Sequence, residues 1–139
     1  MNNSNTIQQA VLRPADWLLR LVVAWEALFY FLAAAFHLGL RLPLGPVVLA
    51  VPDVIVSAAI VETLLGLVVA ANLVLLLRGA RRARAVTLGA HLFALVGVLF
   101  GMAALALRVG PPPSPHWTLH FIMLAGIAAA LGLLGVKSF

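Results

Sequence analysis

The chain has 139 residues, of which 64% are hydrophobic and 9% charged, whereas soluble domains average about 45–50% and about 25%. A soluble domain of this size could not bury so much apolar surface, because small domains leave much of their surface in water. The composition therefore excludes a soluble enzyme and a disordered tail, and the absence of cysteine excludes a disulfide scaffold. It indicates a single-domain integral membrane protein.

Residues 1–16 form a polar N-terminal segment, and four apolar runs follow it. Each run reaches the about 20 residues that a transmembrane helix needs. The predicted spans are residues 17–40, 54–77, 86–107 and 117–136. Short connections between such spans favour an antiparallel bundle. The sequence thus predicts an all-α fold, a four-helix transmembrane bundle with up-down-up-down order.

The connections between the runs carry helix-breaking or charged residues. Prolines in the segment 41–53 and the three prolines at 111–113 resist helix continuation. Residues 78–84 read RGARRAR, a short charged turn. Ser114 followed by Pro115 is a typical helix start, so the fourth helix is expected to begin near there.

Net charge is +5, with nine Lys and Arg against four acids. Basic residues cluster on one side of the predicted membrane, and that side holds Arg13, Arg20, Arg78, Arg81, Arg82, Arg84 and Lys137. The other side holds Arg41 and Arg108. The positive-inside rule then predicts cytoplasmic termini and a multi-pass protein of a bacterial-type inner membrane. This explains the charge better than nucleic-acid binding, which we do not expect.

The arginines of the 78–84 turn have a second interpretation. Arg78, Arg81, Arg82 and Arg84 are candidate contacts for anionic lipid headgroups, each contributing about 1 kcal/mol near the surface. The simpler alternative is that they set topology alone.

Small residues recur at spacings that suit helix packing. Gly97 and Gly101 form a small-xxx-small pattern, and residues 125–135 are rich in Gly and Ala. Such faces pack helices within a bundle, against another copy or against other membrane subunits.

Ionisable groups inside hydrocarbon are expensive, so each is a functional candidate. By helical rise and depth, the first predicted constellation is a carboxyl pair near the midplane, Glu26 and Glu62, with Tyr30 and His91 beside it. The spacing of Glu26, Tyr30 and His37 places them on one helix face. Such a carboxyl pair, with one member held neutral, would bind a proton or a cation. The alternative is that both serve as hydrogen-bonded contacts between helices.

The second predicted constellation is a histidine cluster near the outer surface, formed by His37, His116 and His120. His116 and His120 are one helical turn apart and share a face. With His37 they are candidate ligands for copper or zinc. Alternatively, His37 and one histidine of the fourth span are candidate axial ligands of haem b. The third possibility is interfacial histidines that reach toward water.

Residues 17–77 resemble the DoxX/DoxD family of small four-helix membrane proteins. The resemblance rests on the start of the first span at Leu18-Leu19-Arg20-Leu21, its end at Ala34-Ala35-Phe36-His37-Leu38, and residues 62–67, Glu-Thr-Leu-Leu-Gly-Leu. The family pattern at the second place is Gly-x-x-Lys-Leu, so His37 stands where the family has lysine and Ala34 where it has glycine. The resemblance implies quinone-related redox complexes or accessory membrane roles, with His37 and Glu62 as the positions of interest.

Three functions remain open from the sequence. The first is an accessory or cofactor-binding subunit of a membrane redox system, holding haem, a metal or a quinone. The second is a proton-coupled transporter or channel component that uses the midplane carboxyls. The third is a structural subunit that packs against a larger complex. No nucleophile, phosphate loop or metalloprotease motif is present, so we do not expect an enzyme acting alone.

Overall fold

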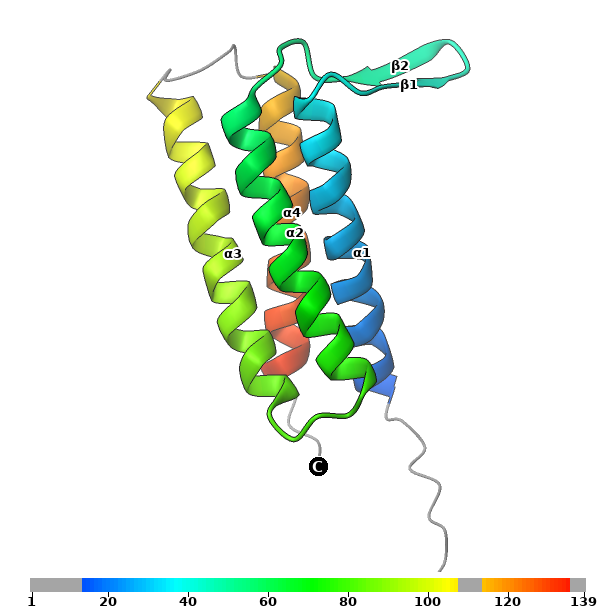
Figure 1. Ribbon diagram of the computed structural model, residues 1–139, viewed down its shortest axis with the longest axis vertical. Helices are drawn as coiled ribbons and strands as arrows, with labels where there is room; N and C mark the ends of the chain where they lie inside the picture. Colours follow the sequence, from blue (N-terminus) through cyan, green and yellow to red (C-terminus); the bar gives the residue numbers. More distant parts are fainter. Residues whose placement is uncertain (1–13, 108–113, 136–139) are drawn as a thin grey trace, which may run out of the picture.

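The computed structural model describes residues 14–107 and 114–135 and is built from four long helices (Figure 1). They are α1 (Pro14–His37), α2 (Val56–Leu77), α3 (Ala83–Ala106) and α4 (Ser114–Gly135). The prediction of an all-helical, four-helix architecture is confirmed. All four helices are long and apolar enough to cross a membrane.

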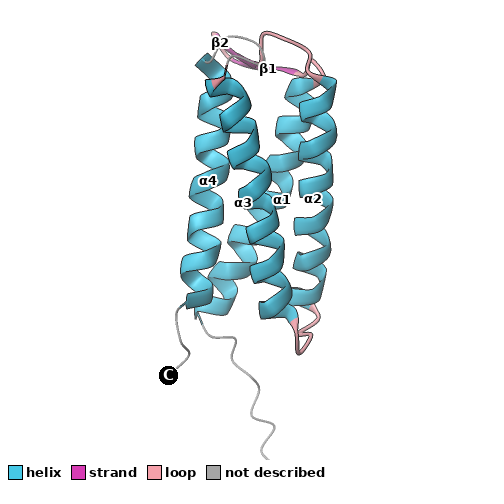
Figure 2. Cartoon of the chain, turned by 90° about the vertical axis from the view of Figure 1, so that its left-hand side faces the viewer, coloured by secondary structure: helices cyan, strands magenta, loops and turns pink. Residues whose placement is uncertain are grey.

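The helices form a ring in which α1 packs against α2 and α4, and α3 packs against the same two helices. Helices α1 and α3 are therefore diagonal neighbours across the bundle axis. The connection between α1 and α2 lies at one end of the bundle, and the turn between α2 and α3 lies at the other (Figures 1 and 2).

The helix ends differ from the predicted ones by a few residues. Helix α1 begins at Pro14, because proline suits the first turn of a helix. It ends at His37 and not at residue 40, since Gly39 takes a positive φ of 94° that breaks the helix. Helix α3 begins at Ala83, so Arg84 lies in its first turn and not in the preceding loop.

The segment 41–53, expected as a loop, contains a short hairpin. Strand β1 (Arg41–Leu44) pairs antiparallel with β2 (Val47–Ala50), with Leu44 opposite Val47. Gly45 at φ +61° opens the two-residue turn, and the fixed negative φ of Pro46 completes it as a type II′ turn. The hairpin projects sideways from this end of the bundle, beyond α1 (Figure 1).

The bundle buries polar side chains and exposes apolar ones. Large apolar side chains face outward, among them Leu28 at 68% and Phe100 at 75% exposure. The buried polar residues are Glu26, His37, Glu62, Asn72, Thr87, His91 and His116. Apolar side chains around Val23, Val69 and Ile127 form the hydrophobic core. This distribution suits a lipid environment, where polar groups must find partners inside the protein.

Several sequence-based predictions concern residues outside the described ranges. They are the polar segment up to residue 13, the charges of Arg13, Arg108 and Lys137, and the prolines at 111–113.

Candidate functional site

In the half of the bundle farther from the hairpin, two buried side chains from the diagonal helices α1 and α3 lie at the distance of an ion pair. Glu26 of α1 and His91 of α3 are 2% and 0% exposed. His91 Nε2 lies 2.7 Å from Glu26 Oε2, and His91 Nδ1 lies 2.7 Å from the carbonyl oxygen of Thr87. A carbonyl oxygen only accepts, so Nδ1 of His91 must carry a proton.

This tautomer determines the protonation of the pair. If His91 were neutral, its Nε2 would be an acceptor facing another acceptor, the ionised carboxylate of Glu26. The short contact therefore requires one further proton between the two side chains. Either His91 is an imidazolium that donates to a carboxylate, or Glu26 is protonated and donates to His91.

Polar neighbours and one glycine hold this pair in place. The Thr87 hydroxyl lies 2.8 Å from the Ala83 carbonyl oxygen and 2.9 Å from Asn72 Oδ1, sharing its single proton between them. A Cβ atom at Gly126 of α4 would lie 2.9 Å from Glu26 Cγ. The glycine thus makes room for the carboxyl side chain.

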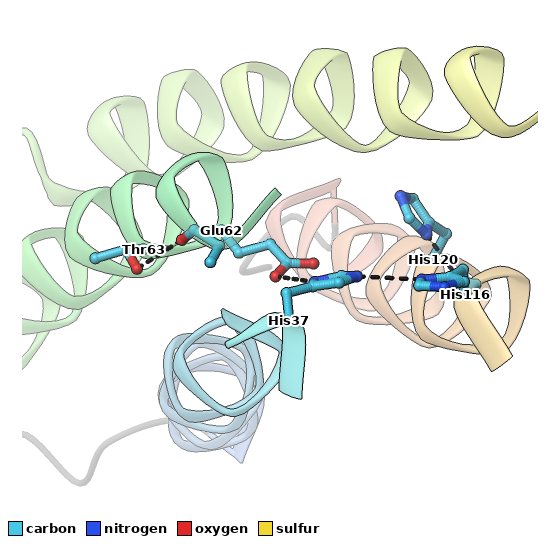
Figure 3. A network of polar contacts seen from close by, with 6 residues as sticks. His37, Glu62, Thr63, His116 and His120 are labelled. Atoms are coloured by element: carbon cyan, nitrogen blue, oxygen red, sulfur yellow. Dashed lines mark hydrogen bonds and ion pairs between the residues drawn. The ribbon is translucent and has the colours of Figure 1, made fainter. Parts of the chain in front are cut away.

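The half of the bundle nearest the hairpin contains a chain of three buried side chains from three helices (Figure 3). Glu62 Oε2 of α2 lies 2.7 Å from His37 Nδ1 of α1. His37 Nε2 lies 3.2 Å from His116 Nδ1 of α4. The two imidazole rings are nearly parallel, at 9°. His116 Nε2, at the far end, is buried without a hydrogen-bond partner among the described residues.

This chain has two self-consistent proton arrangements. In the first, His116 Nδ1 donates to His37 Nε2, and His37 Nδ1 donates to an ionised Glu62. In the second, a protonated Glu62 donates to His37 Nδ1, His37 Nε2 donates to His116 Nδ1, and His116 Nε2 carries a proton. The second arrangement holds one proton more than the first. A proton added at His116 Nε2 can therefore reach Glu62 by two short transfers.

His120 lies beside the chain and not in it. Its Nδ1 lies 2.8 Å from the carbonyl oxygen of His116, one turn earlier, and therefore donates to it. A Cβ atom at Gly101 of α3 would collide with His120 Nε2, so this glycine admits the ring. Gly97, the other member of the pattern, lies against Leu65. Both glycines thus serve contacts inside the bundle.

Tyr30 lies on the buried face of α1 between Glu26 and His37 in sequence. It is 1% exposed, and its hydroxyl has no hydrogen-bond partner in the described residues. An unpaired buried hydroxyl is costly, so this atom is available to a water molecule or to a shifted neighbour.

The structure groups the predicted residues differently from the sequence-based interpretation. Each carboxyl group pairs with a histidine, Glu26 with His91 and Glu62 with His37, so the predicted carboxyl pair is not formed as a direct contact. His37 belongs with Glu62 and His116. Thr87 and Gly126 were missed, because small or weakly polar residues in apolar helices give no distinct signal.

The predicted cofactor ligands do not have cofactor geometry. His37 Nε2 faces His116 Nδ1 at hydrogen-bonding distance, which leaves no space for a porphyrin plane between them. Within residues 14–107 and 114–135, no three His, Asp or Glu side chains are arranged to hold a metal ion. Haem b, copper and zinc therefore do not fit these residues as they are placed.

The arginines of the turn between α2 and α3 divide into two groups. Arg78, Arg81 and Arg82 are exposed, as lipid-headgroup contacts would be. Arg84 is engaged, since it lies 3.4 Å from Asp16 Oδ1 and donates at 3.0 Å to the carbonyl oxygen of Leu134. It thereby joins the ends of α1, α3 and α4.

Comparisons with known proteins found no matching family model, no similar curated protein and no similar solved structure. Function must therefore be argued from the site alone.

Proposed function

We propose that this chain is a membrane proton relay, acting as a proton-coupled transporter or as a component of one. The observation that supports this most strongly is the continuous contact from His116 through His37 to Glu62, with spacings of 3.2 Å and 2.7 Å. Imidazole relays protons because one ring nitrogen accepts while the other donates. All three side chains are buried in the half of the bundle nearest the hairpin.

Proton transfer along this chain conserves protons at every step. His116 Nε2 takes up a proton, and His116 then passes its Nδ1 proton to His37 Nε2. His37 in turn passes its Nδ1 proton to Glu62. Each ring ends neutral with its proton on Nε2, and Glu62 ends protonated. The reverse sequence returns the proton to the His116 side.

The pair of Glu26 and His91 provides a second proton-holding site deeper in the bundle. Glu26 lies on the same helix face as Tyr30 and His37. The Tyr30 hydroxyl and Glu26 Oε1 are both buried without a hydrogen-bond partner among the described residues. We propose that Tyr30 connects the two sites through a water molecule. A proton would then cross the membrane through two relays in series.

The orientation we propose is antiparallel, up-down-up-down, with both termini cytoplasmic, in a bacterial-type inner membrane. The exposed Arg78, Arg81 and Arg82 at one end of the bundle support it, because cytoplasmic loops carry the excess of basic residues. In this orientation His116 takes up protons from the outer side, and the three arginines contact anionic lipid headgroups.

The alternative of a redox subunit has weaker support. It rests on the likeness of residues 17–77 to the DoxX/DoxD family and on no feature of the site geometry. A quinone-binding role and membership of that family remain predictions, as does packing against other subunits or a second copy through Gly and Ala faces.

The test is proton flux into liposomes that contain the purified protein and a pH-sensitive dye. A pH gradient with its diffusion potential dissipated by valinomycin should drive dye acidification. Glu62→Gln should lower the rate by about 100-fold, the contribution of a well-placed proton-transfer group. Asp16→Asn makes the same chemical change at a half-buried surface carboxyl and should leave the rate unchanged. Equal flux in Glu62→Gln and the parent protein would refute the proposal.

A further inference from the structure

A cavity of about 210 Å³ adjoins the Glu62 end of the relay. It lies between α2, α3 and α4 in the half of the bundle nearest the hairpin. Its apolar walls are formed by Ile55, Ala58, Val61, Leu65, Val98, Phe100, Ala104, Leu105 and Met123. An apolar protein cavity of about 150 Å³ accommodates benzene, so this one has room for a single ring with a short substituent.

The polar part of the cavity wall is formed by His37, Glu62, His116 and His120, with Ser57 near the rim. Glu62 uses one carboxylate oxygen, Oε2, for His37 (Figure 3), and the side chain lines the cavity. His120 donates its Nδ1 proton to a backbone carbonyl, so its Nε2 is an acceptor. When Glu62 is ionised, His116 Nε2 is an acceptor too. These acceptor groups therefore favour a ligand that donates hydrogen bonds.

We propose that the cavity binds a small apolar ammonium ion, a single ring that carries a primary amine, with the ammonium group on Glu62. The proposal rests on the proposed function, because it uses the relay that protonates Glu62. None of the described residues that line the cavity carries a fixed positive charge. An ionised carboxylate in an apolar cavity without such a partner favours a cation strongly.

Proton and ammonium ion compete for the same carboxylate. When the relay delivers a proton to Glu62, the carboxyl group becomes neutral and the ammonium ion leaves. When the ion binds, the proton returns through His37 to His116. The exchange at this carboxylate is one proton for one cation.

Among the described residues, the other titratable groups around Glu62 come from two helices and one loop. Helix α1 contributes His37 and, by its electrostatic interaction with Glu62, Tyr30, and α4 contributes His116 and His120. Asp53, before α2, acts electrostatically on His116. The α3 residues that line the cavity do not titrate: Gly97, Val98, Phe100, Gly101, Ala104 and Leu105. Substitutions at Glu62 and at the histidines can therefore distinguish which of these groups causes a pH dependence of ligand binding.

The test is calorimetric binding of benzylammonium to the full-length protein in detergent. Saturable 1:1 binding is expected, with release of one proton in weak buffer and loss of affinity as pH falls. Benzoate, with the same ring and opposite charge, should not bind. Glu62→Gln should lower affinity by at least tenfold, whereas Asp16→Asn should bind as the parent does. No binding of benzylammonium, or equal binding of benzoate, would overturn the proposal.

A second variant separates this proposal from the proton relay. Ala104→Phe fills the cavity from α3 without changing any polar group. It should abolish benzylammonium binding and leave proton flux in liposomes intact. Flux without benzylammonium binding in the parent protein would refute the cavity site alone. Benzylammonium binding with flux unaffected by Glu62→Gln would refute the relay. If Ala104→Phe binds the ion as well as the parent does, the ligand is not in this cavity.

Discussion

The carboxyl group of Glu26 and the imidazole of His91 are 65 residues apart in sequence and meet at 2.7 Å in the interior of the bundle. They come from the diagonal helices α1 and α3, which have few other contacts with each other. This hydrogen bond therefore crosses the bundle axis. It fixes the distance between α1 and α3, which the packing of neighbouring helices constrains only weakly.

Removing one member of this pair should destabilise the bundle severely. Glu26→Ala leaves His91 buried without its partner, and breaking such a pair costs about 3–5 kcal/mol. Glu26→Gln should cost much less, because the amide can still donate to His91 Nε2. Unfolding in mixed detergent micelles with increasing SDS measures both free energies. Equal losses for Ala and Gln would show that the hydrogen bond is not what stabilises the pair.

The close approach of α4 to Glu26 depends on Gly126. An added Cβ would lie 2.9 Å from both Glu26 Cγ and Trp25 Cζ3, so Gly126→Ala should destabilise by about 1–3 kcal/mol. Gly132 lies on the same helix with nothing within 4 Å of its Cβ position. Gly132→Ala should thus be neutral in the same SDS titration. A larger loss at Gly132 than at Gly126 would contradict the packing described for α4.

The surface pair of Arg84 and Asp16 should contribute little. The two side chains are 45% and 37% exposed and lie 3.4 Å apart, and exposed ion pairs contribute about 0–1 kcal/mol. Asp16→Asn should therefore change the free energy of unfolding by less than about 1 kcal/mol. This is why it serves as the control for Glu62→Gln. If Asp16→Asn lowered the free energy of unfolding as much as Glu26→Ala, it could not serve as that control.

The proposed orientation can be tested by labelling, because the chain has no cysteine. Arg81→Cys lies in the turn between α2 and α3, and Val48→Cys lies in the hairpin at the other end. In spheroplasts, an impermeant maleimide should label the residue at 48 and leave that at 81 unlabelled until the membrane is opened. The reverse pattern would invert the orientation, and labelling of both from one side would contradict a membrane-spanning bundle.

Much of the fold could be predicted from the sequence because lipid imposes simple constraints. Run length identified all four helices, and the cost of buried charge identified Glu26, His37, Glu62 and His91 as residues of the bundle interior. His116 was expected nearer the membrane surface, yet it is buried as well. The hairpin was missed, since its strands are too short for a periodic signal. The type II′ turn at Gly45 and Pro46 was the available clue.

The pairing of those residues could not be predicted in the same way. Counting residues gives the depth of a backbone atom to within one helical turn, whereas a hydrogen bond depends on the rotation of each helix about its axis. His37 was assigned a shallower level than Glu62, yet the two meet, because α1 ends at His37 and a glutamate side chain spans most of one turn. The contact across the diagonal from Glu26 to His91 depends on how four helices close into a ring.

Histidine-ring ¹⁵N NMR of the protein in lipid bilayers tests the relay most directly. All four histidines, at 37, 91, 116 and 120, lie in the bundle. With Glu62 ionised, His37 should carry its proton on Nδ1. When acidification protonates Glu62, that proton should move to Nε2, while His91 keeps its Nδ1 proton throughout. A His37 ring that keeps its Nδ1 proton in both states would contradict proton transfer through His37.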